Sequence, residues 1–223
     1  MKKILLLLCL LAAPAAHATP YFSADTVPPT LIDPPFAADS AGQKADIDAI
    51  IQAQAKANPA EVASAREERN MRPELVTLAV NSALTREAYP ALYHLLDRVS
   101  DTSYVTTQAA KNYWNTKRPY LMDTRVKALI EAHDNPAYPS GHTSGSYSWA
   151  HVLAMLLPEK REAFMARAEE IAQHRVLVGM HYHYDLKGGR ELALLMVGAL
   201  TQNAEFQKDL AAAKVELADK RAK

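Results

Sequence analysis

The chain has 223 residues, of which 49% are apolar and 22% charged, and its 25 basic and 25 acidic side chains give a formal net charge of zero. This length suits one domain with a substantial core, and the apolar share excludes a disordered chain. No basic run is present that could neutralise a phosphate backbone, so the composition argues against a nucleic-acid-binding protein.

Residues 1–18 predict a secretory signal peptide. Two lysines begin the stretch, an apolar run follows, and the small-x-small sequence at 16–18 is typical of a cleavage site. The apolar run is too short to span a bilayer, which argues against a membrane anchor. Cleavage after Ala18 would remove the single cysteine, Cys9, and leave a mature chain with a formal net charge of −2. We therefore expect a periplasmic or secreted protein, with no membrane association in its mature form.

The mature chain divides into a proline-rich arm and a helical domain. Residues 19–40 predict an extended arm that wraps the domain, with a disordered leader as the alternative. Residues 41–223 predict an all-helical domain, because no stretch alternates with the period of a strand. Its first helices are expected at 41–58, 60–70, 73–84 and 86–99, the last with a kink at Pro90.

The stretch 106–118 brings two basic residues into a regular spacing. Lys111 and Arg118 are seven residues apart, which would place them on one face of a helix. Pro119 biases Arg118 away from helical geometry, so we expect Arg118 at the helix end, facing a cleft. A short helix at 123–131 and a loop at 133–138 are expected to follow.

The loop leads into the sequence Pro139-Ser140-Gly141-His142. Ser140 is a good N-cap for a helix over 143–157, so the amides near Gly141 and His142 would point at an anion. Gly141 has no side chain and allows the backbone to approach such a ligand closely. Small residues early in this helix predict close packing against another helix.

A helix over 158–178 carries His174 and Arg175 near its end, and Gly179 is expected to turn the chain towards His181. Asp185 follows His181 by four residues, so the two side chains could meet on one helical face. The stretch 185–206 is strongly apolar and is expected to be the central helix of the core. A closing helix is expected at 208–223.

The residue types gathered in these three stretches suit the binding and transfer of a phosphate. Arginine matches two phosphate oxygens with a planar fork, and lysine adds a point charge. One neutral histidine can attack phosphorus while a second, protonated, donates to the leaving oxygen. A carboxylate on one ring nitrogen of the attacking histidine fixes its tautomer.

The blocks Lys-x6-Arg-Pro, Pro-Ser-Gly-His and Arg-x5-His-x3-Asp occur in this order from Lys111 to Asp185. This pattern resembles the acid phosphatase and vanadium haloperoxidase superfamily, which also contains the type-2 phosphatidic acid phosphatases. Within it, the chain most resembles the secreted bacterial class A non-specific acid phosphatases. The resemblance implies an all-α, single-domain helical bundle.

The resemblance also implies a role for each matching residue. His181 would be the nucleophile that forms a phosphohistidine, Asp185 would orient it, and His142 would protonate the leaving alcohol and later activate water. The substrate would be a small-molecule phosphomonoester, phosphate and vanadate would inhibit, and no cofactor or metal would be needed. The expected phosphate ligands are Lys111, Arg118, Ser140, Gly141 and Arg175.

One position departs from the family pattern, since the third block usually begins Ser-Arg and here reads His174-Arg175. His174 is expected beside the bound anion, or else at the helix C-terminus as a partner of the helix dipole. His183 is expected at the rim of the site.

Three other functions stay open at this point. The first is a vanadate-dependent haloperoxidase. The second is a metal-dependent phosphoesterase that uses His181 and His183, because His-x-His-x-Asp can hold zinc. The third is a non-catalytic anion-binding protein, which would not need paired histidines. The sequence does not fix the oligomeric state, and a homo-oligomer stays open.

Overall fold

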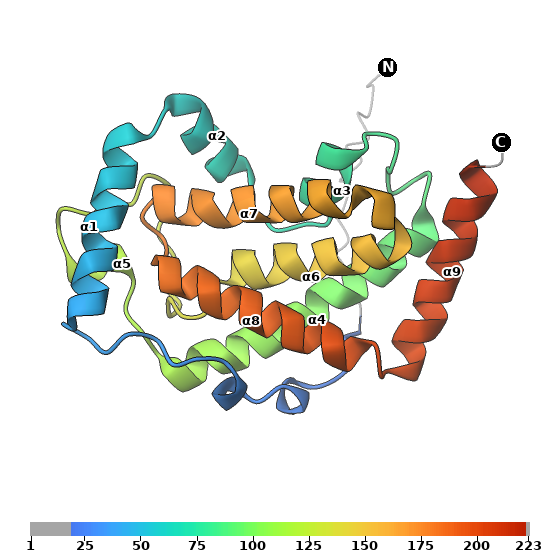
Figure 1. Ribbon diagram of the computed structural model, residues 1–223, viewed down its shortest axis with the longest axis horizontal. Helices are drawn as coiled ribbons and strands as arrows, with labels where there is room; N and C mark the ends of the chain where they lie inside the picture. Colours follow the sequence, from blue (N-terminus) through green and yellow to red (C-terminus); the bar gives the residue numbers. More distant parts are fainter. Residues whose placement is uncertain (1–18, 222–223) are drawn as a thin grey trace, which may run out of the picture.

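The computed structural model describes residues 19–221, and these form a bundle of helices without strands (Figure 1). The predicted all-α class is confirmed, while the predicted signal peptide at 1–18 lies outside the described residues. Over the described part of the chain, no helix combines the length and apolarity that crossing a bilayer requires. The helices are α1 (Ala41–Lys56), α2 (Pro59–Glu67), α3 (Glu74–Val80), α4 (Pro90–Trp114), α5 (Pro119–Met122), α6 (Gly141–Leu156), α7 (Arg161–Leu177), α8 (His183–Leu200) and α9 (Ala204–Arg221).

Residues 19–40 run along the lower edge of the bundle in Figure 1, with two 3-10 turns at Ala24–Thr26 and Pro29–Leu31. Tyr21, in this arm, is buried, and its amide donates to Thr102 Oγ1 at 2.9 Å. Asn203 Nδ2 donates to the carbonyl of Tyr21, also at 2.9 Å. The arm is thereby joined to α4 and to the α8–α9 turn.

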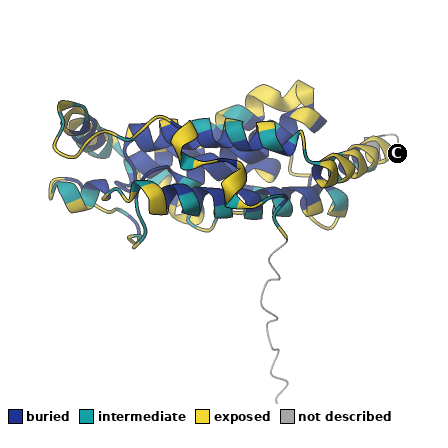
Figure 2. Cartoon of the chain, turned by 90° about the horizontal axis from the view of Figure 1, so that it is seen from below, coloured by how far each residue is buried: buried dark blue, intermediate teal, exposed yellow. Residues whose placement is uncertain are grey.

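Helix α6 lies at the centre of the bundle and packs against α4, α7 and α8 (Figure 1). It contains no aspartate, glutamate, lysine or arginine, and it is buried along almost its whole length. Figure 2 shows this buried middle layer in dark blue. The prediction that 185–206 is the central helix is wrong, since α8 exposes 61% of Leu194. Small side chains let α6 approach three helices at once, which the bulkier residues of α8 do not.

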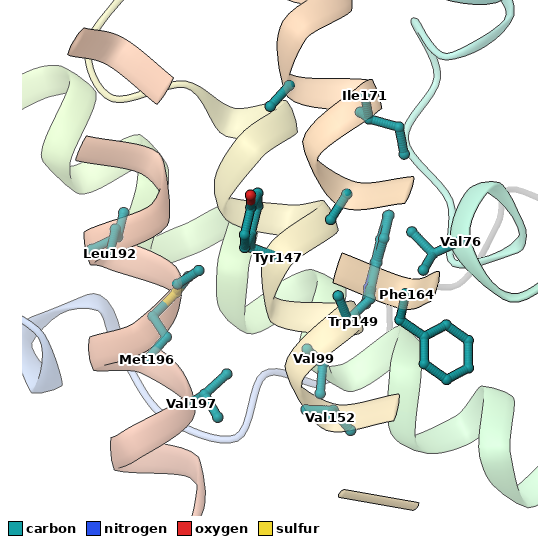
Figure 3. Packing of buried hydrophobic residues seen from close by; sticks show 14 of the residues in the cluster. Val76, Val99, Tyr147, Trp149, Val152, Phe164, Ile171, Leu192, Met196 and Val197 are labelled. Carbon is teal, nitrogen blue, oxygen red and sulfur yellow. The ribbon is translucent and has the colours of Figure 1, made fainter. Parts of the chain in front are cut away.

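The core forms where side chains of α6 meet those of its neighbours (Figure 3). Trp149 and Val152 project from α6, and Phe164 of α7 and Val76 of α3 lie beside Trp149 in Figure 3. Each fully buried side chain of this size stabilises the fold by about 1.5–3 kcal/mol. A core built on both faces of α6 holds the N-terminus of that helix in place.

Helix α4 is a single helix where the sequence predicted separate helices at 86–99 and 106–118. Pro90 occupies its first turn, where no amide donor is required, so the predicted kink is absent. The helix ends at Trp114, and Asn115 adopts a left-handed conformation with φ of 44°. Lys111 and Arg118 therefore do not share a helical face, and the prediction that they would is wrong.

Two further helix predictions are wrong. Residues 123–131 form turns, because Lys127 N–H donates to Gln54 Oε1 at 3.0 Å and Leu129 N–H donates to the carbonyl of Val178 at 3.1 Å. The stretch 185–206 is interrupted after Leu200, because Asn203 Oδ1 accepts from the amide of Phe206 at 3.0 Å and begins α9. A short capping side chain outweighs apolar periodicity here.

Candidate active site

A pocket of about 300 Å³ opens between the N-terminus of α6 and the C-terminal half of α4. The three sequence blocks meet at one end of this pocket, together with the loop that precedes Pro139. We call this the catalytic end. Its lining residues are Lys111, Arg118, His133, Asn135, His142 and His181, with Gly141 beside them.

The two cations of the first block are held by backbone carbonyls. Lys111 is 3% exposed, and its Nζ donates to the carbonyls of Pro136 and Ala137 at 2.5 and 2.9 Å. Arg118 donates from Nε to the carbonyl of Asn135 at 3.0 Å and from Nη1 to the carbonyl of Met180 at 2.9 Å, and its Nη2 donates to Asn135 Oδ1 at 2.6 Å. Burial, followed by the charge of Arg118, lowers the pKa of Lys111 well below its usual value. These contacts fix both side chains before any ligand arrives.

His181 is held from both ring nitrogens. Its Nε2 lies 2.8 Å from Arg118 Nη1, and its Nδ1 lies 2.9 Å from Asp185 Oδ2. A guanidinium can only donate, so Nε2 must accept, and the ring proton must be on Nδ1 and donate to Asp185. Burial, reinforced by the charges of Arg118 and Lys111, lowers the pKa of His181 well below its usual range. The ring is therefore neutral, with a lone pair on Nε2.

Asp185 meets His181 through a capping turn. Helix α8 begins at His183, so His181 precedes the helix, and the predicted meeting on one helical face is wrong. Asp185 Oδ2 also accepts from the amide of Tyr182 at 3.1 Å, which locks the turn. Burial raises the pKa of Asp185 to about 7, although the Tyr182 amide and the charges of Lys111 and Arg118 oppose that rise.

Helix α6 presents its first turn to the catalytic end. Ser140 does not line the pocket but caps the helix, since its Oγ accepts from the amide of Thr143 at 3.3 Å. The first backbone hydrogen bond of the helix joins the Ser144 amide to the Ser140 carbonyl at 2.9 Å. The amides of Gly141 and His142 precede it and can serve an anion at the positive end of the helix dipole.

His142 lines the pocket with a defined tautomer. Its Nε2 lies 3.1 Å from the carbonyl of Glu68 and 3.5 Å from Arg175 Nη1. The carbonyl is the nearer partner and can only accept, so we place the ring proton on Nε2, which leaves Nδ1 for proton exchange with a ligand. Burial, followed by the charge of Arg175, lowers its pKa well below the usual value. The side chain is accordingly neutral.

Arg175 and His174 converge on Glu68. Arg175 is fully buried and does not line the pocket; its Nη2 donates to Ala65 O at 2.6 Å and to Glu68 Oε2 at 3.1 Å. His174 Nδ1 lies 2.9 Å from Glu68 Oε2, and Arg167 Nη2 lies 2.8 Å from Glu68 Oε1. The sequence analysis missed Glu68, because a carboxylate in the charged stretch after residue 65 looks like part of a solvated helix.

His183 is separate from the pocket. Its Nδ1 lies 2.5 Å from Asp46 Oδ1, and 44% of its side chain is exposed. The structure therefore does not bring it to the catalytic end beside His181. Within residues 19–221, no group of three or more histidine, cysteine or acidic side chains is arranged to hold a metal ion.

His133 is a pocket residue that the sequence analysis did not assign. Its ring centroid lies 6.2 Å from that of His142, and its buried Nε2 has no hydrogen-bond partner in the described part of the chain. Burial, followed by the charge of Arg118, lowers its pKa to about 4. The only sequence signal was its position in the loop before Pro139.

The model of the PAP2 superfamily matches residues 100–209, a segment that holds Lys111, Arg118, His142, His181 and Asp185. The chain belongs to the PAP2 superfamily. The matched segment of this PAP2 chain includes most of α4 and all of α6, α7 and α8, which are the elements that build the catalytic end.

Known PAP2 relatives of this chain include acid phosphatases. The chain is 33% identical over 133 residues to an acid phosphatase of Zymomonas mobilis, an alignment that covers 57% of this chain and 50% of that protein. It is 32% identical over 140 residues to a non-specific acid phosphatase of Providencia stuartii, covering 60% of this chain and 56% of the other. This PAP2 chain therefore aligns with little more than half the length of these relatives.

The fold is also found in a solved structure. A bacterial vanadium-dependent iodoperoxidase superposes with a TM-score of 0.58 at 19% identity, covering 78% of this PAP2 chain and 52% of the other chain. At this identity the likeness concerns the helical architecture alone.

Gly189 sets how closely α8 approaches the start of α6. A Cβ atom on Gly189 would lie 2.8 Å from both Ser140 O and Thr143 Cβ, which is too close for any side chain. We expect Gly189→Ala to displace the Ser140–His142 turn, with a loss of about 1–3 kcal/mol of stability and a clear loss of turnover. The control is Gly198→Ala, where a Cβ would meet nothing within 4 Å. Equal unfolding temperatures and equal turnover for the two variants would contradict this packing argument.

Proposed function

We propose that the protein is an acid phosphatase that hydrolyses small-molecule phosphate monoesters through a phosphohistidine on His181, without a metal ion. The observation that carries the proposal is the tautomer of His181, whose Nε2 lone pair lies among fixed cations while Asp185 holds the Nδ1 proton. The similarity to acid phosphatases supports the substrate class. The pattern of residues 1–18 supports export to the periplasm or the medium.

In the first step, Nε2 of His181 attacks phosphorus, the new P–N bond forms, and the ester P–O bond breaks. Arg118 would leave Nε2 and bind phosphoryl oxygens together with Lys111 and the amides of Gly141 and His142. Asp185 accepts the Nδ1 hydrogen bond throughout and stabilises the positive charge that develops on the ring.

In the same step, His142 gives a proton to the departing alkoxide oxygen. Burial and nearby cations lower the pKa of His142, but a bound phosphate dianion would offset those charges and favour the protonated ring. In the second step His142 takes a proton from water as the water oxygen attacks phosphorus. The P–N bond then breaks, releasing inorganic phosphate and restoring neutral His181.

The proposed metal-independent mechanism can be tested with a chelator and with vanadate. We expect a strong chelator to leave the hydrolysis of 4-nitrophenyl phosphate unchanged, because attack by His181 and phosphate binding by Lys111 and Arg118 need no metal. Vanadate should inhibit, since it mimics five-coordinate phosphorus. Brief incubation with labelled substrate and quenching in alkali should trap a phosphoenzyme that is labile in acid.

Three outcomes would each favour one of the alternative functions instead. Activity lost with chelator and restored by zinc would favour a metal-dependent phosphoesterase, in which His183 turns from Asp46 towards His181. Phosphate binding without any turnover would favour an anion-binding protein. A peroxidase activity with bound vanadate and halide would favour the haloperoxidase alternative.

A further inference from the structure

The pocket continues beyond the catalytic end, between α4 and α6. These helices run in opposite directions (Figure 1). Gly141, Gly145 and Trp149 all line the pocket and follow each other at four-residue steps along one face of α6. At a rise of 1.5 Å per residue, Trp149 lies about 12 Å along the helix axis from Gly141. We call this extension the distal end; its other lining residues include Met71, Ser100, Ser103 and Tyr104.

Two of the hydroxyl groups that line the distal end, those of Ser100 and Thr107, are engaged within the protein. Ser100 Oγ accepts from Trp149 Nε1 at 2.9 Å and donates to the carbonyl of Leu96 at 2.8 Å. Thr107 Oγ1 and Ser144 Oγ share a hydrogen bond of 2.7 Å. A ligand therefore meets the indole of Trp149, the Met71 thioether and the Thr107 methyl group, with the Ser103 and Tyr104 hydroxyl groups beside them.

One charged side chain, Asp101, also lines this part of the pocket. The distal end thus differs in chemistry from the catalytic end, where the lining charges are basic.

We propose that the distal end is a binding subsite for the alcohol half of the substrate, and that it selects uncharged, apolar alcohols of about the size of one aromatic ring. This inference rests on the proposed phosphatase function. The volume of about 300 Å³ for the whole pocket is at the lower limit for ligand sites, which leaves room for a phosphate and one ring. Such an alcohol extends from phosphorus along α6 towards Trp149.

Gly145 determines whether this passage is open. A Cβ atom on Gly145 would lie 3.2 Å from Met71 Cε and 3.9 Å from Ser103 Oγ, which are both lining residues. A larger side chain there would occupy the space between them. The absence of a side chain at 145 therefore admits the alcohol, and Gly145 determines specificity without touching the phosphate.

The test compares two substrates whose leaving groups are both primary alcohols, so that protonation by His142 matters equally. We expect kcat/KM for 2-phenylethyl phosphate to exceed that for glycerol 1-phosphate by about 10–100-fold, since apolar contacts of this size discriminate to that extent. Equal values, or a preference for glycerol 1-phosphate, would overturn the subsite. No activity on either ester would instead count against the proposed function itself.

Gly145→Leu should then lower kcat/KM for 2-phenylethyl phosphate at least 10-fold, mainly through KM. Glycerol 1-phosphate hydrolysis and inhibition by inorganic phosphate should change by less than about 2-fold, because those ligands need only the catalytic end. Gly198→Leu is the matched control, since a side chain there enters open space and should leave both substrates unaffected.

A second variant keeps the test decisive if Gly145→Leu does not fold. Tyr104 lines the pocket but is 64% exposed, so Tyr104→Ala should fold normally. It should reduce the preference for 2-phenylethyl phosphate by shortening the apolar wall. An unchanged ratio of the two kcat/KM values in a folded Tyr104 variant, or equal losses on both substrates in Gly145→Leu, would overturn the proposal.

Discussion

His181→Ala should lower turnover by about 10⁴-fold or more with every phosphate ester, because the covalent intermediate can no longer form. Aryl and alkyl esters should be affected alike, since both need the same nucleophile. The variant should still bind inorganic phosphate, because Lys111, Arg118 and the α6 amides stay in place. The measurements are kcat on the two ester types and phosphate affinity by calorimetry.

His183→Ala is the matched control for this variant. His183 belongs to the same His-Tyr-His sequence but contacts Asp46 and is 44% exposed. Its removal should leave turnover within about 2-fold of the wild-type value, as for most exposed side chains away from a site. Comparable losses for the two variants, with sensitivity to chelator, would mean that both histidines hold a metal. The phosphohistidine proposal would then be wrong.

The local parts of the site could be predicted from the sequence because short-range rules determine them. Ser140 caps α6 as its residue type and position indicated. Gly179 ends α7 with φ of +76° and redirects the chain to His181, as expected for a glycine at that place. Lys111, Arg118, His142 and His181 do reach one pocket, although the spacing argument for Lys111 and Arg118 was wrong.

The parts that the sequence did not reveal depend on contacts between distant segments. Glu68 reaches His174 and Arg175 across more than a hundred residues, and no local pattern marks a carboxylate for such a position. The Asp185–His181 contact was predicted, but the turn that makes it was not, because helix starts are harder to locate than helices. The environment of His174 likewise could not be derived without Glu68.

Glu68→Gln should be the most destabilising single substitution near the site. Glu68 is 1% exposed, forms ion pairs with Arg167 and Arg175, and lies within hydrogen-bond distance of His174. Glutamine keeps the size and some hydrogen bonds but removes the charge, which leaves Arg175 buried beside no anion. We expect a loss of about 3 kcal/mol in the free energy of unfolding at pH 7. Turnover should also fall, because the backbone carbonyl of Glu68 holds His142 and the Glu68 side chain holds Arg175.

The stability that Glu68→Gln loses should depend on pH, and the direction of that dependence follows from the pKa of Glu68. Burial raises the pKa of Glu68, but the His174 hydrogen bond and the charges of His174, Arg167 and Arg175 outweigh burial and lower the pKa below its usual value. A carboxylate with a lowered pKa contributes stability above its unfolded pKa, which is about 4.3 for glutamate, and loses it as pH falls through the folded pKa. The stability gap between wild type and Glu68→Gln should therefore be full at pH 6–7 and shrink below about pH 4.

Glu170→Gln provides the control for this experiment, because Glu170 also pairs with Arg167, at 2.7 Å, but is 55% exposed. An exposed ion pair contributes about 0–1 kcal/mol, so this variant should unfold nearly like the wild type at every pH. Urea unfolding of the three proteins from pH 3.5 to 7 measures both effects. If Glu68→Gln followed Glu170→Gln at pH 7, or if its deficit did not change with pH, the charge of Glu68 would not be what holds Arg175 and His174 together. Apolar packing around α2 and α7 would then be sufficient to place Arg175 behind His142.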